Sequence, residues 1–527
     1  MRDVVIIGAG HNALVAAAFL AKAGRRPLVL ERSDRLGGCA STSEIAPGFH
    51  CPAVVHTIAI DPAIIRALSL ERHGLHIIRP EAAACAPARD GRALVLWADA
   101  ARAARSIAAF SRKDAEQYPK FLTSVARISG VLRAINNATP PSLDDPTAAD
   151  LIEMLKAGRR FRALGRADAY RLLRWMPMAV ADLASEWFES EPLRATVAAG
   201  GVLGSFLGPW SAGSAALLLW LAAGEGHPIA TGWLAKGGPG AMADALAASA
   251  REAGAEIRTG ADIVRIIVSD RAARGVVLSN GEEIAARVVV SGLDPKRTLL
   301  GLTDPMHLAP DFVRAVQNIR SRGTLAKINY AVASIPRFTA TSGLGETERA
   351  ALSGRVRLNP DIDAIERAFD AAKYGGVAPD PWMELTIPSI ADPSLAPPGQ
   401  HVISAYLQYV PGRLRDMTRD AERERLGDLS TRTIASYAPG FEASVLAREV
   451  ITPLDLERTY GLTGGHIFQG ELALDQFFVT RPLLGWARYD TPVHGLYLCG
   501  SGTHPGTGVS GRSGALAAQT IVRQSKR

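Results

Sequence analysis

Glycine-rich stretches at the two ends of the chain carry the clearest chemical pattern. Near the start, Gly8-x-Gly10-x-x-Ala13 follows the apolar run 4–7, and near the end the sequence GSGTHPGTGVSG occupies residues 500–511. Glycines at such spacings let a backbone approach a phosphate closely, and the helix that follows turns free N–H groups and its positive dipole end toward the anion. Both stretches therefore predict a nucleotide-binding loop, although little more than one helix follows the second.

The first stretch lies within a pattern of strand, turn, helix and strand. We expect a buried parallel strand over 4–7, a helix over 12–23 and a second strand that ends at Glu31. A carboxylate at that place accepts both hydroxyls of an adenosine ribose and repels the extra phosphate of NADP. The combination predicts a dinucleotide-binding unit, and the alternative is an ordinary turn before a buried helix.

A second glycine pair after Glu31 indicates which dinucleotide is bound. The segment RLGGCAST, residues 35–42, resembles the second motif of the large FAD family that includes amine oxidases and phytoene desaturases. Residues 495–511 are similar to the signature of its phytoene-desaturase branch. Residues 204–215 and 437–478 resemble the subgroup of the pyridine nucleotide-disulfide oxidoreductase domain-containing proteins and the desaturase-like carotenoid ketolases. The resemblance covers nearly the whole chain.

The resemblance implies that the two ends of the chain hold one FAD. A strand over 494–500 would return to the first sheet, and the N–H groups at the start of a helix over 510–523 would face the flavin and stabilise its charge on reduction. Cys39 stands where many members carry an arginine, and Ile263 matches the position whose backbone contacts adenine. The implied FAD-binding residues are Gly8, Gly10, His11, Asn12, Ala13, Glu31, Arg32, Gly37, Gly38, Cys39, Thr42, Ile263, Gly500, Ser501, Gly508, Val509 and Ser510.

His504 is the candidate catalytic residue, because the last glycine loop is expected to place it near the flavin ring. Removal of a hydride from a C–H bond also releases a proton, which a base can accept. The alternative is a histidine that only bonds backbone within a tight loop. His466, Asp475 and Gln476 are weaker candidates, and we expect no metal site.

We expect an α/β fold in which a FAD-binding Rossmann-like domain of the glutathione reductase/amine oxidase type carries an inserted α+β substrate domain. The FAD-binding domain comprises 1–75, 232–300 and 485–527. The substrate domain comprises 76–231 and 301–484, with a helical part and a mixed sheet. Strands in TLAKINYAVAS and HVISAYLQYV are expected to share that sheet and to form one wall of the substrate pocket.

Composition excludes several classes of partner. The formal charge is +7 and the pI about 9.3, but only 6% of residues are aromatic and no basic run is interleaved with them. This argues against nucleic acid and suits an anionic ligand or membrane surface better. The spacing of the four cysteines predicts neither a zinc site nor a redox disulfide. With no signal peptide ahead of the first strand, we expect a cytoplasmic protein, or a mitochondrial matrix protein in a eukaryote. The oligomeric state stays open.

Two segments raise the question of a membrane. Residues 195–224 carry no charge and are long enough to span a bilayer, but glycines and a proline interrupt them, so we favour a helix that lines an apolar cavity. Residues 156–178 are basic and include several apolar side chains. They predict either peripheral contact with an anionic bilayer or a solvated helix packed on its own domain.

Three hypotheses for function follow. The favoured one is a FAD-dependent oxidoreductase of the desaturase, saturase or ketolase type that acts on a hydrophobic polyene or lipid-like substrate. The second is a flavin amine oxidase, and the third is a flavin-bound regulatory protein with little turnover. The direction of the reaction, the electron acceptor and any part for NAD(P) stay open.

Overall fold

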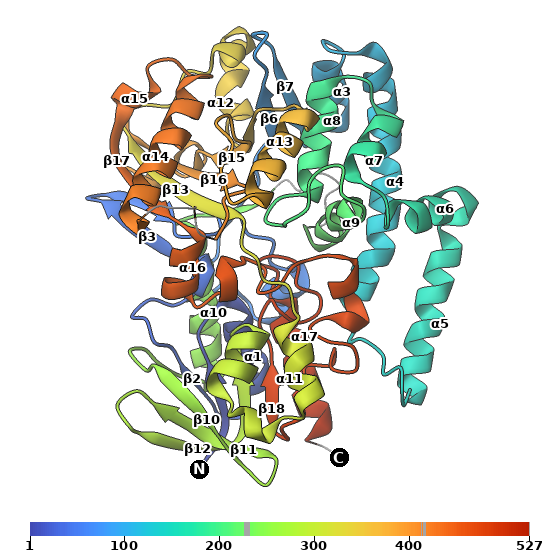
Figure 1. Ribbon diagram of the computed structural model, residues 1–527, viewed down its shortest axis with the longest axis vertical. Helices are drawn as coiled ribbons and strands as arrows, with labels where there is room; N and C mark the ends of the chain where they lie inside the picture. Colours follow the sequence, from blue (N-terminus) through green and yellow to red (C-terminus); the bar gives the residue numbers. More distant parts are fainter. Residues whose placement is uncertain (226–231, 413, 415–417, 526–527) are drawn as a thin grey trace.

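A computed structural model of the protein describes residues 1–225, 232–412, 414 and 418–525. Figure 1 shows two halves: the lower one contains both chain ends, and the upper one is built around a second sheet with helices beside it. The predicted boundary at residue 231 lies outside the described residues. The division into domains stays a prediction.

A mainly parallel sheet forms the half that contains both chain ends. Its central strand β1 pairs in parallel with β12 on one side and β2 on the other, β9 pairs with β2, and β18 pairs with β12. Val5 thus lies between Val289 and Leu28, which explains the continuous apolar run, since helices and strands cover both faces. The strands are β1 (Arg2–Ile7), β2 (Pro27–Leu30), β9 (Glu256–Arg258), β12 (Glu283–Ser291) and β18 (Leu496–Leu498).

An antiparallel meander extends this sheet. Strand β10 (Ile263–Ser269) pairs with β11 (Ala272–Leu278), which pairs with the start of β12. The Asn280-Gly281 dipeptide, a sequence typical of hairpin turns, forms the turn between β11 and β12; Gly281 has a φ of +87° and the Asn280 side chain accepts a hydrogen bond from the Glu282 N–H.

Three helices pack together around the parallel sheet: α1 (His11–Lys22), α10 (Pro239–Glu252) and α17 (Arg512–Gln524). A Cβ on Gly514 would lie 1.9 Å from the carbonyl oxygen of Asn12, so glycine permits the close approach of α17 to α1. The last helix therefore returns to the first strand–helix unit, as the resemblance implied.

The second sheet combines two separate parts of the chain, residues 82–97 and residues 325–451. These parts precede and follow strands β9 to β12 of the first sheet in the sequence. Its order is β17-β13-β16-β15-β14-β6-β7, antiparallel except for the parallel pair β14 and β6. Strands β13 and β16 share this sheet, as expected, and are neighbours in it. The strands are β17 (Val445–Ile451), β13 (Leu325–Val332), β16 (His401–Gln408), β15 (Met383–Thr386), β14 (Arg355–Leu358), β6 (Ala82–Pro87) and β7 (Ala93–Trp97). Two short ribbons pair β3 (Thr42–Ala46) with β4 (Phe49–Pro52) and β5 (Ile77–Ile78) with β8 (Leu234–Ala235).

Helices cover the second sheet. The uncharged segment 195–224 forms the end of α8, a short 3₁₀ turn, a loop over 202–213 and most of α9, whose side chains are largely buried. No helix among the described residues is long and apolar enough to cross a membrane. Figure 1 shows α5 and α6 standing out at one side. The helices of this group are α3 (Ala100–Ile107), α4 (Arg112–Asn136), α5 (Ala148–Ala163), α6 (Gly165–Trp175), α7 (Val180–Trp187), α8 (Glu191–Ala198) and α9 (Ser214–Glu225).

The remaining helices are short or lie late in the chain. They are α2 (Pro62–Ala67), α11 (Pro310–Gln317), α12 (Glu348–Ala351), α13 (Ile362–Lys373), α14 (Arg419–Ala435), α15 (Phe441–Ser444) and α16 (Pro453–Tyr460). Of these, α16 contributes most directly to the site, because the chain that follows it borders the main cavity.

Candidate FAD and substrate site

A cavity of about 530 Å³ lies where the two chain ends meet, a size typical of small-molecule sites. It runs from the start of α1 past the end of β2 and the start of β10 to the last glycine loop. The sequence-predicted residues that line it are Gly8, Gly10, His11, Asn12, Ala13, Glu31, Arg32, Gly37, Gly38, Cys39, Ile263, Ser501, Gly508 and Val509.

The two N-terminal glycine motifs lie side by side at the start of α1. The Gly37 N–H donates to the carbonyl oxygen of Ala9 over 2.9 Å, and Gly10 forms a parallel bridge with Gly37. A Cβ on Gly10 would have no atom within 4 Å, so the space in front of this backbone is open. The first turn of α1 carries no acidic residue. Free helix N–H groups facing open space fit the pyrophosphate of a dinucleotide.

Glu31, at the end of β2, fits the ribose end. One carboxylate oxygen accepts a hydrogen bond from the Ala9 N–H at 2.7 Å and the other from the Ser33 N–H at 2.9 Å. Each carboxylate oxygen keeps a further lone pair for a hydroxyl donor. Ala261, Asp262 and Ile263 border the same end of the cavity, where the resemblance places adenine.

Side chains of the first loop bind the last loop directly. The Asn12 amide donates to Ser501 Oγ over 3.2 Å and accepts from the Gly514 N–H over 3.4 Å. Burial lowers the pKa of His11 to about 4, partly opposed by a hydrogen bond with the Gly508 backbone, so its ring is neutral at pH 7. The two loops therefore form one wall.

Three residues of the predicted FAD set do not line the cavity. Thr42 Oγ1 accepts from the Gly240 N–H at 2.9 Å, so Thr42 supports the start of α10. Gly500 is enclosed, since a Cβ there would lie 2.3 Å from the Gln469 amide oxygen. The Ser510 hydroxyl faces its own loop, 3.4 Å from Thr507 Oγ1. These residues support the loops rather than border the cavity.

His504, the predicted catalytic residue, lines neither this cavity nor the second one described below. Its Nε2 lies 3.2 Å from the Ile135 carbonyl oxygen, and its ring packs edge-on against Trp220 and Phe478. Burial lowers its pKa to about 3. This position matches the alternative of a histidine that bonds only backbone. The catalytic role of His504 stays a prediction, and the residue borders neither cavity.

The weaker candidates are also bound elsewhere. His466 Nδ1 accepts from the Phe468 N–H at 3.2 Å, and Asp475 forms two hydrogen bonds with Arg320. The stretch that does border the cavity, residues 459–462 and 467–469, was not predicted from the sequence. The glycines in YGLTGGH were the available signal, since they mark a loop directly after a helix.

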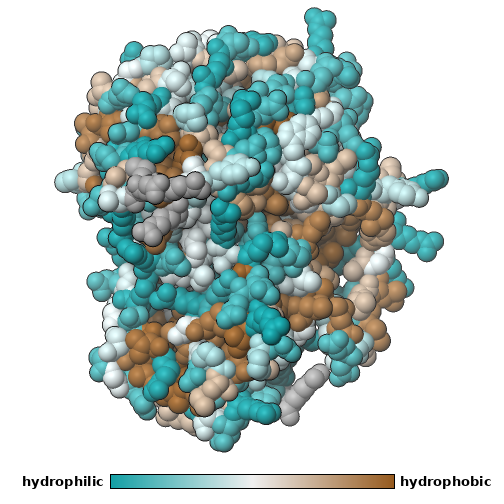
Figure 2. All heavy atoms as spheres, viewed as in Figure 1, coloured by the Kyte–Doolittle hydropathy of each residue, from teal (hydrophilic) through white to brown (hydrophobic). Residues whose placement is uncertain are grey.

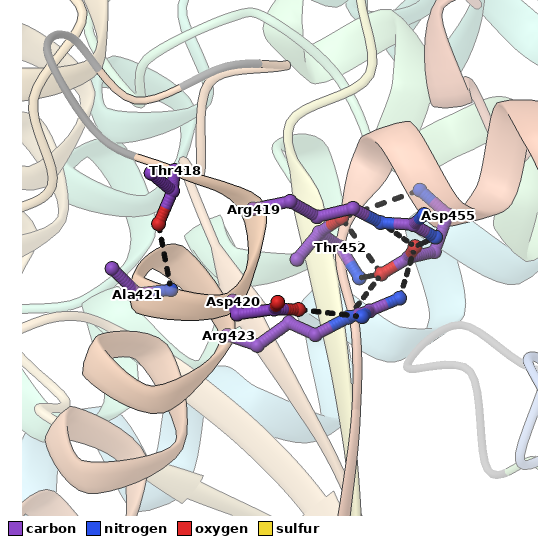
Figure 3. A network of polar contacts seen from close by, with 7 residues as sticks. All are labelled: Thr418, Arg419, Asp420, Ala421, Arg423, Thr452 and Asp455. Carbon is purple, nitrogen blue, oxygen red and sulfur yellow. Dashed lines mark hydrogen bonds and ion pairs between the residues drawn. The ribbon is translucent and has the colours of Figure 1, made fainter.

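A polar network fixes α16, which precedes this stretch (Figure 3). Asp455 forms a capping box with Thr452 and accepts hydrogen bonds from Arg419 and, at 2.7 Å, from Arg423 on α14. Burial alone would raise the pKa of Asp455, but the hydrogen bonds from Arg423, Thr452 and Arg419 outweigh it and lower the pKa to about 2. The network thus fixes the start of α16, whose last residues, Thr459 and Tyr460, border the cavity.

A second, smaller cavity of about 100 Å³ adjoins the first. Both cavities are bordered by Val55, Ile467, Phe468, Gly508 and Val509. Most of the remaining wall is apolar and comes largely from the uncharged segment, which was expected to line such a cavity. Its residues are Val197, Gly200, Leu203, Leu218, Leu221 and Ala222.

The other side of the second cavity is charged. Arg357 Nε donates to Glu384 Oε2 over 2.8 Å, and Arg355 Nε lies 3.7 Å from Glu384 Oε1. His56 Nε2 lies 3.5 Å from the same oxygen, and the His56 ring packs on Tyr406 at 4.0 Å between centroids. Burial opposes ionisation of Glu384, but Arg355 and Arg357 together hold its pKa well below the usual range.

This charged side was not predicted from the sequence. Charged residues within the otherwise apolar strands RVRL and MELT were the available signal, because a charge in a buried strand needs a partner. The partners come from different strands, and pairing of those strands cannot be deduced from local pattern.

Arg481 supports the residues at the junction of the two cavities without lining either cavity. Its side chain is fully buried and donates to the carbonyl oxygens of Phe468 at 2.7 Å and Ser501 at 2.8 Å. Burial lowers its pKa to about 9. A planar guanidinium is suited to collect several carbonyl groups at once.

A parallel sheet with two adjoining glycine motifs, an acidic residue after its second strand and a returning C-terminal loop defines a dinucleotide-binding fold of the flavoprotein type. Residues 6–68 match the NAD(P)-binding Rossmann-like domain, and residues 181–522 match the flavin containing amine oxidoreductase family. The chain belongs to this family of flavin-dependent oxidoreductases, and its cofactor is FAD.

Relatives match over almost the full length. Pyridine nucleotide-disulfide oxidoreductase domain-containing protein 2 of Rattus norvegicus is 37% identical over 99% of this chain and 94% of its own. A limonene dehydrogenase chain of Castellaniella defragrans is 26% identical (99% and 94%), and a lycopene-forming phytoene desaturase of Pseudescherichia vulneris 25% (97% and 96%). The structure of cyclohexylamine oxidase from Brevibacterium oxydans superposes with a TM-score of 0.57 at 17% identity, covering all of both chains, and supports the fold.

Proposed function

We propose that the protein transfers a hydride between FAD and a hydrophobic, lipid-like substrate, in a reaction of the desaturase, saturase or ketolase type. One observation carries this proposal: a largely apolar cavity adjoins the FAD cavity and shares Ile467, Phe468 and Val509 with its wall. A substrate there would lie next to the cofactor within walls that exclude water. Two relatives are named for phytoene and limonene, which supports an apolar substrate.

When bound, the flavin supplies the hydride acceptor or donor, and the chain supplies position and proton transfer. The apolar side chains of α9, among them Leu218 and Leu221, would orient the substrate. His56, which borders the second cavity, is the candidate base that accepts the proton released with the hydride. Burial, together with the nearby Lys327, lowers its pKa to about 3, so the ring is neutral. The Glu384 carboxylate lies near His56 Nε2 and favours the tautomer that carries its proton on Nε2. His56 Nδ1 is then able to accept a proton from the substrate.

Anaerobic reduction of the bound flavin tests the proposal. The purified holoprotein is mixed without oxygen with limonene, with detergent-solubilised phytoene or with cyclohexylamine, and the flavin absorbance is followed. Bleaching by one of the two terpenoids and not by the amine is expected. Bleaching by cyclohexylamine alone would instead identify an amine oxidase, and bleaching by none would overturn the proposal for substrates of these kinds. His56→Gln should slow bleaching about 100-fold while the flavin stays bound.

We also propose peripheral contact with an anionic membrane through α5. Leu151 and Leu155 on this helix are 55% and 58% exposed, and Arg159, Arg160 and Arg162 follow near its end. Figure 2 shows hydrophobic surface along the edge of the molecule where α5 stands. An exposed helix with apolar and basic residues is suited to lie on a bilayer and to collect a lipid-soluble substrate.

A further inference from the structure

The charged side of the second cavity contains buried polar atoms that the described residues leave without a hydrogen bond. They are His56 Nδ1, Arg355 Nε, Glu225 Oε2 and Glu384 Oε1, and all four residues border the cavity. His56, Arg355 and Glu384 are at least nine-tenths buried. Leaving a buried polar group unpaired costs about 1–3 kcal/mol, so four such atoms around one cavity call for a common partner.

These atoms include both acceptors and a donor. Glu384 Oε1 and Glu225 Oε2 are carboxylate oxygens that can only accept, whereas Arg355 Nε can only donate. Arg355 is otherwise held by Thr57 Oγ1 at 3.1 Å and Glu225 Oε1 at 3.4 Å. A group that donates and accepts at the same atom would satisfy both kinds of partner.

The charges of the cluster already balance. The guanidinium groups of Arg355 and Arg357 face the carboxylates of Glu384 and Glu225, and His56 is neutral. An ammonium would therefore add an unpaired positive charge, and a carboxylate would add an unpaired negative one, at a buried place where such a charge is costly. The cluster favours a neutral group.

Lys327 lies behind this cluster without bordering the cavity. Its ammonium nitrogen lies 4.6 Å from the centre of the Tyr406 ring and is hydrogen bonded to Ser404. Burial lowers its pKa to about 7, so above that pH it is mostly neutral and leaves the balance unchanged. When Lys327 is protonated, its positive charge disfavours the binding of a cationic ligand still further.

The size of the cavity limits the rest of the ligand. At about 100 Å³ it is smaller than a cavity of roughly 150 Å³ that accepts benzene. It therefore encloses only a short apolar portion of a substrate, comparable to a five-carbon ring or chain, and the rest of a longer substrate such as phytoene would have to lie outside it.

We infer that the second cavity binds a hydroxyl group on a short apolar portion of the substrate, with the hydroxyl donating to Glu384 or Glu225 and accepting from Arg355. This inference rests on the proposed function, because it names the substrate class for the same site. It predicts that a hydroxylated substrate binds more tightly than the corresponding amine or pure hydrocarbon.

Four matched ligands test the inference: cyclopentanol, cyclopentane, cyclopentylamine and cyclopentanecarboxylate. Each is titrated at pH 8 into the FAD-loaded protein, and binding is measured from the shift of the flavin absorbance and from the melting temperature. Cyclopentanol is expected to bind at least 10-fold more tightly than the other three. Equal binding of cyclopentane, tighter binding of either charged ligand, or binding of none would overturn the inference.

Variants separate the hydroxyl site from the apolar wall. Arg355→Met is expected to weaken cyclopentanol about 10-fold and leave cyclopentane unchanged, and Arg349→Met on exposed α12 is the matched control. If Arg355→Met fails to fold, Glu225→Gln, at a position whose side chain is 18% exposed, gives a second test with a smaller loss in the same direction. Binding without flavin bleaching would separate this inference from the proposed reaction, because ligand selectivity does not depend on turnover.

Discussion

The Asn12 side chain donates a hydrogen bond to Ser501 Oγ over 3.2 Å, although the two residues are 489 positions apart. Asn12 lies in the first turn of α1, whose start faces the open space in front of Gly10, and Ser501 lies in the last glycine loop. Both residues border the large cavity. The bond therefore joins the phosphate end of the FAD site to the loop expected at its ring end.

A side chain at Gly10 should exclude the cofactor without unfolding the protein. Gly10 has a φ of −65°, which any residue adopts, and a Cβ there meets no atom within 4 Å. Gly10→Leu is therefore expected to fold, to melt as a single transition and to purify without the flavin absorbance. Gly158→Leu on α5, also with open space around it, should keep the yellow colour. A yellow Gly10→Leu protein with unchanged FAD affinity would contradict this assignment of the phosphate site.

Asp455→Asn should loosen α16 in a pH-dependent way. The pKa of Asp455 is lowered to about 2, so its stabilising effect is complete above the unfolded value of about 3.9 and is lost as the pH falls toward 2. At pH 6 we expect the variant to lose about 2 kcal/mol in free energy of unfolding. The difference from the unmodified protein should shrink toward pH 2.5.

Urea unfolding at several pH values measures this difference, and Asp144→Asn at an exposed position is the control. A difference that stays constant between pH 6 and pH 2.5 would show that the Asp455 charge does not act through the arginines of α14.

Lys327 should make stability rise with pH. Its native pKa is about 7, whereas an unfolded lysine titrates near 10.4, so between these values the unfolded state binds more protons. The free energy of unfolding is then expected to increase with pH, by at most about 1.4 kcal/mol per unit. Lys327→Met should remove this increase, and Lys120→Met at an exposed position should not. Parallel pH profiles for the protein and Lys327→Met would refute the buried-lysine explanation.

Contact of α5 with membranes can be measured by sedimentation with vesicles. Phosphatidylglycerol vesicles are expected to bind the protein at least 10-fold more tightly than phosphatidylcholine vesicles. Changing Leu151 and Leu155 together to glutamate should abolish the difference, because it removes apolar area and adds negative charge. Met306→Glu, a change at an 80% exposed methionine on another element, is the control. Equal binding to both vesicle types would argue for a solvated helix.

The parts of the fold that depend on neighbouring residues could be predicted from the sequence. The run of valine and isoleucine before Gly8, the carboxylate of Glu31 and the turn at Asn280 and Gly281 each follow a local rule. The structure shows the expected strand, helix and hairpin at these places. The return of the C-terminus came from the resemblance rather than from any local pattern.

The charged side of the second cavity could not be predicted, because it depends on how distant strands pair. Arg355, Glu384 and Tyr406 lie on three adjacent strands, and His56 reaches them from a loop. Nothing within a short window indicates that these residues meet. His504 shows the converse case: its loop was placed correctly, but the ring faces the Ile135 carbonyl oxygen on α4, away from both cavities.

The pairing of β18 with β12 has a consequence for how the protein matures in the cell. Because the wall of the FAD cavity includes Ser501, Gly508 and Val509, the pocket is incomplete until these residues have left the ribosome. The glycine loops at residues 8–10 and 37–38 must wait for a partner that is synthesised much later. FAD should therefore bind only after residues 496–509 have been synthesised, and stop codons ahead of residue 496 should yield products that never acquire the prosthetic group.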